Sequence, residues 1–157
     1  MNNKNTLLLK PSEKLNKDHL NLVSVIFLFD GPKKVLMQHR DNDSKIACPN
    51  IWGPVGGHCE VGETPYECCI RELFEETGYE SSQLDWYGNF LVPYNCESNS
   101  KHVVSVFWAL YDNIQVINCY EGQSINFLYL SLLKNYKMLD INSKWIKGIE
   151  KILLYAR

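Results

Sequence analysis

Residues 57–79 of the chain read GHCEVGETPYECCIRELFEETGY, and three carboxylates fall within five positions of that stretch. These are Glu72, Glu75 and Glu76, and Arg71 stands directly before them. A segment that only had to fold would gain nothing from this concentration of acids, since neighbouring like charges repel on a helix. This concentration of acids therefore indicates a function for the stretch.

Local signals predict a helix over residues 65–77. Thr64 and Glu67 have the spacing of a capping box, and Pro65 stands at the first helical position, where its missing N–H costs nothing. Gly78 has the character of a glycine that ends a helix.

The apolar and acidic residues of this helix fall on different arcs. The three glutamates share one arc, in the second half of the helix, where the helix dipole disfavours anions. Glu72 faces Glu75 and Glu76 at i+3 and i+4 and repels both. At about 100° per residue, the other arc holds the side chains expected in the core: Tyr66, Cys69, Ile70, Leu73, Phe74 and Thr77.

One positive charge, on Arg71, stands against three negative ones, which indicates a missing cation. An all-oxygen ligand set suits Mg²⁺ or Mn²⁺. The alternative is an acidic helix face that is simply solvated. The glycine-rich stretch 52–57 favours the metal site, because it can bring a backbone carbonyl close to the helix without side-chain obstruction.

The whole stretch resembles the signature of the Nudix hydrolases, the MutT-like family. The last matching position, usually aliphatic in the family, is Tyr79, a departure that leaves the metal site untouched. Nine positions match at fixed spacings: Gly57, Glu63, Arg71, Glu72, Leu73, Glu75, Glu76, Gly78 and Tyr79.

The resemblance implies Mg²⁺-dependent hydrolysis, with Mn²⁺ as a second option, of a nucleoside diphosphate linked to another group X. It implies metal contacts from the Gly57 carbonyl, Glu75 and Glu76. Glu72 is implied as a metal-associated carboxylate or the general base. Arg71 is expected to orient the glutamates by pairing with Glu63 or with its helix neighbours.

Two residues outside the stretch are further candidates. Glu121 opens the sequence Glu-Gly-Gln, which several triphosphate-cleaving members of the family carry in this place, so it is expected to be a further metal ligand or base. Its alternative is a turn acid beside Gly122. Arg40 ends a predicted strand and is expected to meet a substrate phosphate; its alternative is a surface ion pair with Asp41 or Asp43.

The rest of the chain predicts an α+β fold, and the resemblance implies a Nudix-type mixed β-sheet sandwiched between α-helices. Residues 1–17 are expected to form a polar N-terminal arm and residues 18–157 a single domain. A second helix is expected over residues 143–155, buried through Trp145, Ile149, Ile152 and Leu153. Apolar runs predict strands over residues 20–29, 35–39, 52–55, 86–93, 102–111, 114–117 and 125–130.

Composition limits the class of protein. The net charge of −2 argues against an extended nucleic-acid surface, and no run is long and apolar enough to be a membrane span. The cysteines lack C-x-x-C spacing and are expected to be reduced thiols in a cytoplasmic protein. They are Cys48, Cys59, Cys68, Cys69, Cys96 and Cys119.

The partner is expected to be a nucleotide-type small molecule, with nucleoside triphosphates or nucleotide sugars favoured over ADP-ribose. The family resemblance also makes a homodimer an expectation. Two alternatives remain: a catalytically silent Nudix-fold binding module, and an isomerase of isoprenoid diphosphates on the same fold. Residues that offer contacts to a base or phosphate are Trp52, Trp86, Tyr87, Tyr94, Phe127, His39, His58 and His102.

Overall fold

A computed structural model describes residues 6–16, 21–93 and 101–155. Tyr94, Cys96 and Leu20, which entered the predictions above, lie outside the described residues. The elements in chain order are β1 (Leu22–Asp30), β2 (Lys34–His39), β3 (Trp52–Gly53), β4 (Val55–His58), α2 (Pro65–Thr77), β5 (Asp85–Pro93), β6 (Lys101–Leu110), β7 (Ser124–Tyr129), the 3₁₀ helix η2 (Leu130–Asn135) and α3 (Asp140–Tyr155).

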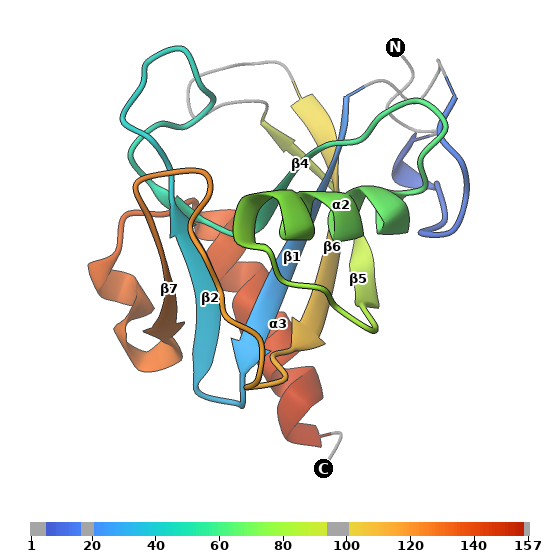
Figure 1. Ribbon diagram of the computed structural model, residues 1–157. Coiled ribbons are helices and arrows are strands. Elements are labelled where there is room, and N and C mark those ends of the chain that lie inside the picture. The colour runs from blue at the N-terminus through green and yellow to red at the C-terminus, as the bar shows by residue number, and fades with distance from the viewer. Residues whose placement is uncertain (1–5, 17–20, 94–100, 156–157) are drawn as a thin grey trace.

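The sheet is mixed and is centred on β1 (Figure 1). Strand β1 runs parallel to β6, whereas its pairings with β2 and β4 are antiparallel. It changes partner along its length: Val23–Ile26 pair with β4, and Phe29 and Asp30 pair with β2. Strand β4, which leads into the acidic helix, is thereby held against the centre of the sheet.

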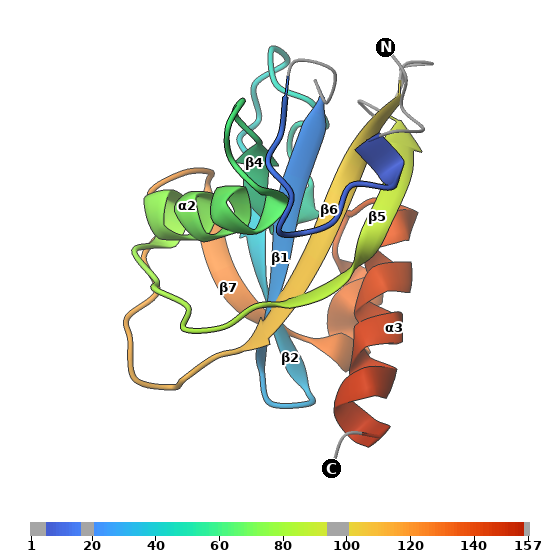
Figure 2. The same cartoon turned by 90° about the vertical axis from the view of Figure 1, so that its right-hand side faces the viewer.

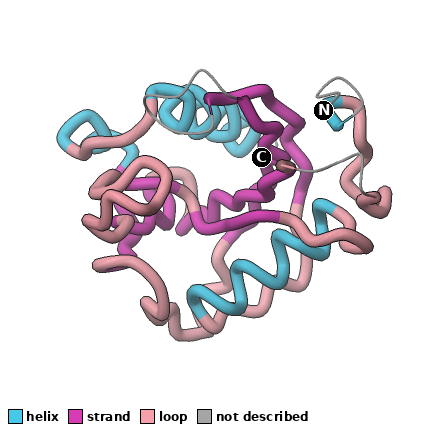
Figure 3. The backbone as a smooth tube through the Cα atoms, turned by 90° about the horizontal axis from the view of Figure 1, so that it is seen from above, coloured by secondary structure: helices cyan, strands magenta, loops and turns pink. Residues whose placement is uncertain are grey.

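One helix covers each face of the sheet. Figure 2 shows α2 on one side and α3 on the other, and Figure 3 shows the strands running between these two helical layers. Leu73 of α2 packs with Ile26 and Phe107, and Trp145 of α3 packs with Phe27 and other residues on the opposite face. The predicted α+β sandwich is confirmed.

The predicted strand over residues 114–117 is wrong. Asp112 accepts hydrogen bonds from the backbone N–H groups of Ile114, at 2.9 Å, and Gln115, at 3.1 Å, so the chain turns there. Ile114 is 84% exposed. The apolar run therefore has no partner strand or core to bury it. The predicted strand at residues 52–55 is divided at Pro54 into β3 and β4.

The two helices differ from prediction in detail. Helix α2 has the predicted bounds, but Phe74 is 49% exposed, and Cys68 is buried in its place. Helix α3 begins at Asp140 rather than at residue 143. Its core face uses Ile146, whereas Ile152 faces outward. In both helices the buried arc is set by where the sheet lies, which the periodicity alone does not state.

The cysteine prediction also needs correction. Cys48 is disulfide-bonded, so it is not a reduced thiol. Cys59, Cys68, Cys69 and Cys119 are free.

The described part of the N-terminal segment packs on the domain. Leu15 pairs through its backbone with the loop that precedes α2: its N–H donates to Glu63 O at 2.7 Å, and its carbonyl accepts from Gly62 N at 3.0 Å. Leu9 and Leu15 are buried with Leu22. Within the described ranges, no helix has the length and apolar character needed to span a membrane.

Candidate active site

The acidic helix α2 is fixed at both ends by its own sequence. At its start, Thr64 N–H donates to the Glu67 carboxylate at 2.8 Å, and Glu67 N–H donates to the Thr64 hydroxyl at 3.0 Å. At its end, Gly78 adopts φ 73°, and its N–H donates to Phe74 O at 2.7 Å. The capping box and glycine end that the sequence predicted are both present, so the carboxylates have a rigid platform.

Two glycines allow β4 to lie between β1 and α2. A Cβ atom on Gly56, which has φ 145°, would lie 2.1 Å from Ser24 O. A Cβ atom on Gly57 would lie 2.6 Å from the carboxylate carbon of Glu72. A side chain at Gly56 would therefore push β4 away from the backbone of β1, whereas one at Gly57 would displace the Glu72 carboxylate, which lies directly against the Gly57 backbone.

Arg71 binds three carboxylates at once. Its guanidinium donates to Glu63 at 2.7 Å, to Glu72 at 2.7 Å and to Glu75 at 3.1 Å. It also donates to the His58 carbonyl at 3.1 Å. The hydrogen bond with Arg71 lowers the pKa of Glu63, and the same bond raises the pKa of the guanidinium. Arg71 thus ties the loop before α2 to the acidic face of the helix.

Glu76 is the buried member of the acidic set. It is 4% exposed, and its carboxylate accepts from Gln38 Nε2 at 2.6 Å and from Gly56 N at 3.3 Å. Burial, followed by the charges of Glu121 and Glu72, raises its pKa to about 8. A carboxyl group in this state is costly to ionise unless a positive charge comes near it.

Gln38 was not singled out from the sequence. It is buried in β2, and its amide also donates to the Glu121 carbonyl at 3.1 Å. The signal that marks it is a polar residue inside an otherwise buried strand, since a buried amide needs hydrogen-bond partners.

The structure places Glu121 beside the helix carboxylates. The charge of Glu121 raises the pKa values of both Glu76 and Glu72, although burial is the largest cause for each. The turn that brings it there depends on Gly122, which has φ 81° and on which a Cβ atom would lie 2.7 Å from His39 O. Glu75, by contrast, is exposed and does not line the adjacent cavity.

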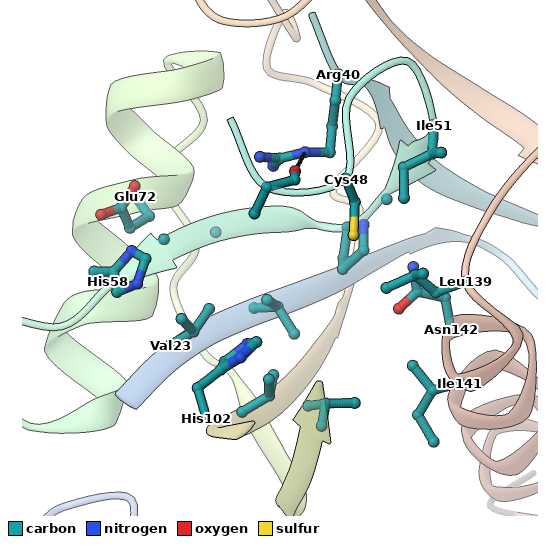
Figure 4. Close-up of a pocket in the computed structure, with 18 of the residues that line it drawn as sticks. Val23, Arg40, Cys48, Ile51, His58, Glu72, His102, Leu139, Ile141 and Asn142 are labelled. Atoms are coloured by element: carbon teal, nitrogen blue, oxygen red, sulfur yellow. Dashed lines mark hydrogen bonds between the residues drawn. The ribbon is translucent and has the colours of Figure 1, made fainter. Parts of the chain in front are cut away.

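A cavity of about 340 Å³ opens beside these carboxylates. Glu72, Glu76, Glu121 and Gly57 line it, and Arg40 extends over it, with its Nε donating to Ala47 O at 3.2 Å (Figure 4). Within the described residues Arg40 forms no ion pair with either neighbouring aspartate. Four valines give the cavity an apolar part of its lining: Val23, Val25, Val92 and Val104.

The base-stacking candidates are not at the cavity. None of the four described ones lines it; they are Trp52, Trp86, Tyr87 and Phe127. His39 stacks on Trp52 with ring centroids 4.9 Å apart. His58 and His102 do line the cavity, and burial followed by the charge of His58 lowers the pKa of His102.

The oxygen atoms of this site are the type of ligand that a hard divalent cation binds. The carboxylates are oxygen ligands, the Gly57 backbone is bare of any side chain, and the raised pKa values of Glu72 and Glu76 mark negative charge in need of compensation. In the described part of the chain, no three acidic, histidine or cysteine side chains are yet grouped so as to hold a metal ion. In this arrangement the Arg71 guanidinium donates hydrogen bonds to both Glu72 and Glu75.

Curated relatives match short segments of this chain. The m7GpppN-mRNA hydrolase NUDT17 of Xenopus laevis is 46% identical over 54 residues, which is 34% of this chain and 18% of the relative. The mouse bis(5'-nucleosyl)-tetraphosphatase (asymmetrical) is 37% identical over 57 residues, which is 36% of this chain and 39% of the relative. The matched segments thus span well under half of either relative.

Solved structures share the fold over most of the chain. An Ap4A hydrolase from C. elegans, in a binary complex, superimposes with a TM-score of 0.67 at 17% identity, covering 86% of this chain and 98% of its own. The Nudix domain of Shewanella oneidensis NrtR, complexed with ADP ribose, gives 0.68 at 16% identity, covering 98% and 99%.

The family profile described as NUDIX domain matches residues 19–146, which include all the strands, the acidic helix and the Glu121 loop. The match covers most of the chain, and the geometry above agrees with it. This chain belongs to the Nudix family.

Proposed function

We propose that the protein hydrolyses a diphosphate linkage in a nucleoside diphosphate joined to a further group X, with Mg²⁺ or Mn²⁺ as the metal. The observation that carries this proposal is that Glu72, Glu76 and Glu121 line one cavity that Arg40 also lines. Glu72 and Glu76 come from α2, Glu121 from the loop before β7 and Arg40 from the end of β2, and folding brings the three acids together despite their mutual repulsion.

The metal would be held by the Gly57 carbonyl and by carboxylates of Glu72, Glu75, Glu76 and Glu121. The chemistry that a divalent cation supplies in such a site is neutralisation of phosphate charge and acidification of a water molecule. The half-buried Glu72, whose pKa is raised, is placed to accept the proton of an attacking water. Arg71 positions Glu72 by its 2.7 Å hydrogen bond.

Other residues would hold the substrate and the buried acid. The guanidinium of Arg40, which has spare N–H donors at the cavity, would bind phosphate oxygens. Gln38 fixes the orientation of the Glu76 carboxylate at 2.6 Å. The valines of the lining would exclude water from part of the bound substrate, which strengthens the electrostatic contacts.

The nature of X is open to a direct screen. The relatives' names point to nucleotides whose phosphate chain bridges to a second nucleoside, so the panel includes diadenosine tetraphosphate and a capped dinucleotide. Nucleoside triphosphates, nucleotide sugars, ADP-ribose and an isoprenoid diphosphate complete it. Product release is followed by phosphate assay and chromatography, with Mg²⁺, with Mn²⁺ and with EDTA.

Metal-dependent cleavage of at least one compound supports the proposal. No cleavage of any compound, with nucleotide binding retained, would instead indicate a silent binding module. A product of unchanged phosphate count from an isoprenoid diphosphate would indicate the isomerase.

The base and the metal ligands can be separated by two variants. Glu72→Gln is expected to lower kcat about 100-fold at saturating metal if Glu72 is the base, because proton transfer contributes on that scale. Glu121→Gln is expected to raise the metal concentration needed for half-maximal rate and to leave kcat at saturation within a few-fold. The reverse pattern would exchange the two roles.

A further inference from the structure

Two free thiols, Cys59 and Cys68, face each other across the contact between β4 and α2. Gly57 gives the register, because a Cβ atom on it would point at the Glu72 carboxylate, 2.6 Å from its carbon. Cys59 follows Gly57 by two positions, and its N–H continues the pairing with β1 by donating to Leu22 O at 2.9 Å. Its side chain therefore leaves the strand on the same side as that Cβ atom, toward α2. Cys68 precedes Glu72 by four positions and lies on the same face of the helix. Because the chain reverses between β4 and α2, and two strand residues span about as much as four helix residues, roughly 6 Å, the two cysteines are brought opposite each other.

The hydrogen bonds of the two thiols agree with this register. The Cys59 sulfur lies 3.2 Å from the Ser24 hydroxyl, which donates to the Pro65 carbonyl in the first turn of α2 at 2.8 Å. The Cys68 thiol donates to the Gly57 carbonyl at 3.8 Å. A hydrogen bond with Cys59 is the largest of the causes that raise the pKa of Cys68. The two thiols are therefore in contact, and no covalent bond joins them.

The two members of this pair differ in their access to solvent. Cys59 is partly exposed, whereas Cys68 is fully buried. A small oxidant therefore meets Cys59 first, with the second sulfur already beside it. The other free thiols are placed differently: Cys69 is buried in the core with Leu73, and Cys119 is exposed and donates to Glu121 O at 3.2 Å.

We propose that Cys59 and Cys68 form an oxidisable dithiol, which hydrogen peroxide converts to a disulfide that ties the end of β4 to α2. The peroxide oxidises the Cys59 thiol to a sulfenic acid and is itself reduced to water. The Cys68 sulfur then attacks the Cys59 sulfur, the S–O bond breaks, and the Cys68 proton leaves with the hydroxyl group as a second water molecule. Two electrons pass from the two sulfur atoms to the peroxide, and both thiol protons end in water.

The disulfide would also act on the candidate active site, a consequence that rests on the function proposed above. An S–S bond is about 2.0 Å long, shorter than any non-bonded contact of two sulfur atoms, so forming it draws the end of β4 and the start of α2 together. Gly57 and Glu72 lie in the same contact, and Arg71 donates to the Cys68 sulfur at 3.8 Å. A misplacement of about 1 Å in such a site lowers the rate, so the oxidised protein is expected to be less active.

The chemical arm of the test maps the bond in the full chain. The protein is treated with hydrogen peroxide, remaining thiols are blocked with N-ethylmaleimide, and trypsin with Glu-C separates the fragment that ends at Glu60 from the fragment 68–71. We expect mass spectrometry to find these two fragments joined, the protein to stay monomeric on a non-reducing gel, and dithiothreitol to separate the fragments. Cys68→Ala should abolish the link. Cys69→Ala should keep it, because Cys69 is buried in the core.

The kinetic arm follows kcat/KM on the best substrate before peroxide, after peroxide and after dithiothreitol. We expect the wild type to lose at least about tenfold and to recover on reduction, whereas Cys68→Ala and Cys59→Ser each keep their own starting rate in peroxide. Both variants retain the disulfide at Cys48, which dithiothreitol also reduces, so their comparison with the wild type isolates the pair. Cys119→Ser, which removes an exposed thiol outside the pair, is the matched control and should respond as the wild type does.

The outcomes separate the dithiol from the proposed function. Fragments that stay unlinked, or a link that survives in Cys68→Ala, would overturn the dithiol; if that variant folds poorly, Cys59→Ser decides the same point. A link that leaves kcat/KM unchanged would overturn its effect on the active site. If the wild-type protein cleaves no substrate, the proposed function fails, and the fragment map decides the dithiol by itself.

Discussion

At the scale of single residues, the acidic set divides into members with different surroundings. Glu76 is buried against Gln38 and Gly56, Glu72 is half-buried against Arg71, and Glu75 is exposed. Burial is the largest cause of the raised pKa of Glu76. One helix turn therefore carries carboxylates whose exposure to solvent differs widely.

Glu76→Gln is expected to lower metal-dependent kcat/KM at least about 100-fold, because it removes an anionic ligand from the centre of the site. The variant should still fold, since a neutral amide can replace a carboxyl group that is itself costly to ionise. Product release and thermal unfolding measure the two effects. Glu80→Gln, an exposed change just beyond the helix, is the control. A Glu76→Gln variant with wild-type turnover would rule out the mechanism.

The pH dependence of stability follows from the same residue. The pKa of Glu76 is raised from 4.5 to about 8 on folding, so between these values the folded protein holds a proton that the unfolded chain has lost. Its favourable contribution is complete below about pH 4.5 and is lost as the pH rises through 8. With EDTA present, the free energy of unfolding should fall over this window, by at most about 1.4 kcal/mol per pH unit.

The comparison that isolates this effect is wild type against Glu76→Gln. His102 acts in the opposite direction, because its lowered pKa makes the folded protein gain stability as the pH rises toward 6.5. Subtracting the free energies of unfolding of the two proteins removes the contribution of His102. The remaining difference should shrink steadily from pH 8 to pH 5. Urea unfolding curves measured at several pH values give this difference. Parallel profiles would contradict the prediction.

At the scale of elements, the site depends on the approach of β4 to α2. The two elements are adjacent in the chain, and the loop between them is fastened by Glu63 to Arg71 at 2.7 Å. The absence of a side chain on Gly57 lets the Glu72 carboxylate lie against the strand.

Gly57→Ala is expected to lower kcat/KM at least about tenfold with little loss of stability. The added methyl group would fall 2.6 Å from the Glu72 carboxylate carbon, and that flexible side chain would move rather than the backbone. Kinetics in the Glu72→Gln background provide the control: the methyl group should then cost much less, because the carboxylate it displaces is already absent. Fully additive losses would show that the change acts through the strand backbone instead.

At the scale of the molecule, three distant segments close the site. The loop that carries Glu121 is held by Gln38 of β2, α3 supplies Asn142 and Trp145, and the N-terminal segment braces the loop before α2. Leu15 joins a buried cluster with Leu9 and Leu22. This packing bears on the proposed boundary between an arm at residues 1–17 and a domain at residues 18–157.

Leu15→Ala is expected to lower the free energy of unfolding by about 2–3 kcal/mol, as truncation of a buried leucine does. The change leaves the backbone hydrogen bonds with the loop in place. Urea denaturation measures the loss, and Leu8→Ala, at a position that is 80% exposed, should cost less than about 0.5 kcal/mol. Equal stability of the two variants would mean that the segment is a dispensable arm.

The sequence by itself determined the features that depend on near neighbours in the chain. The bounds of α2, its capping box and its terminal glycine follow from residues within four positions of one another, and the main strands follow from apolar runs. The same locality explains the errors. An apolar run at residues 114–117 resembles a strand, and Phe74 resembles a core residue, until it is known which surfaces lie opposite.

Only the tertiary structure decided how the acids differ and what stands across from them. Gln38 and Glu121 are 83 positions apart in the chain and meet at 3.1 Å. Asn142 lies still further along and faces the same cavity as Glu72. Burial of Glu76 and exposure of Glu75 both arise from packing between distant segments, and no local pattern records which segments will touch.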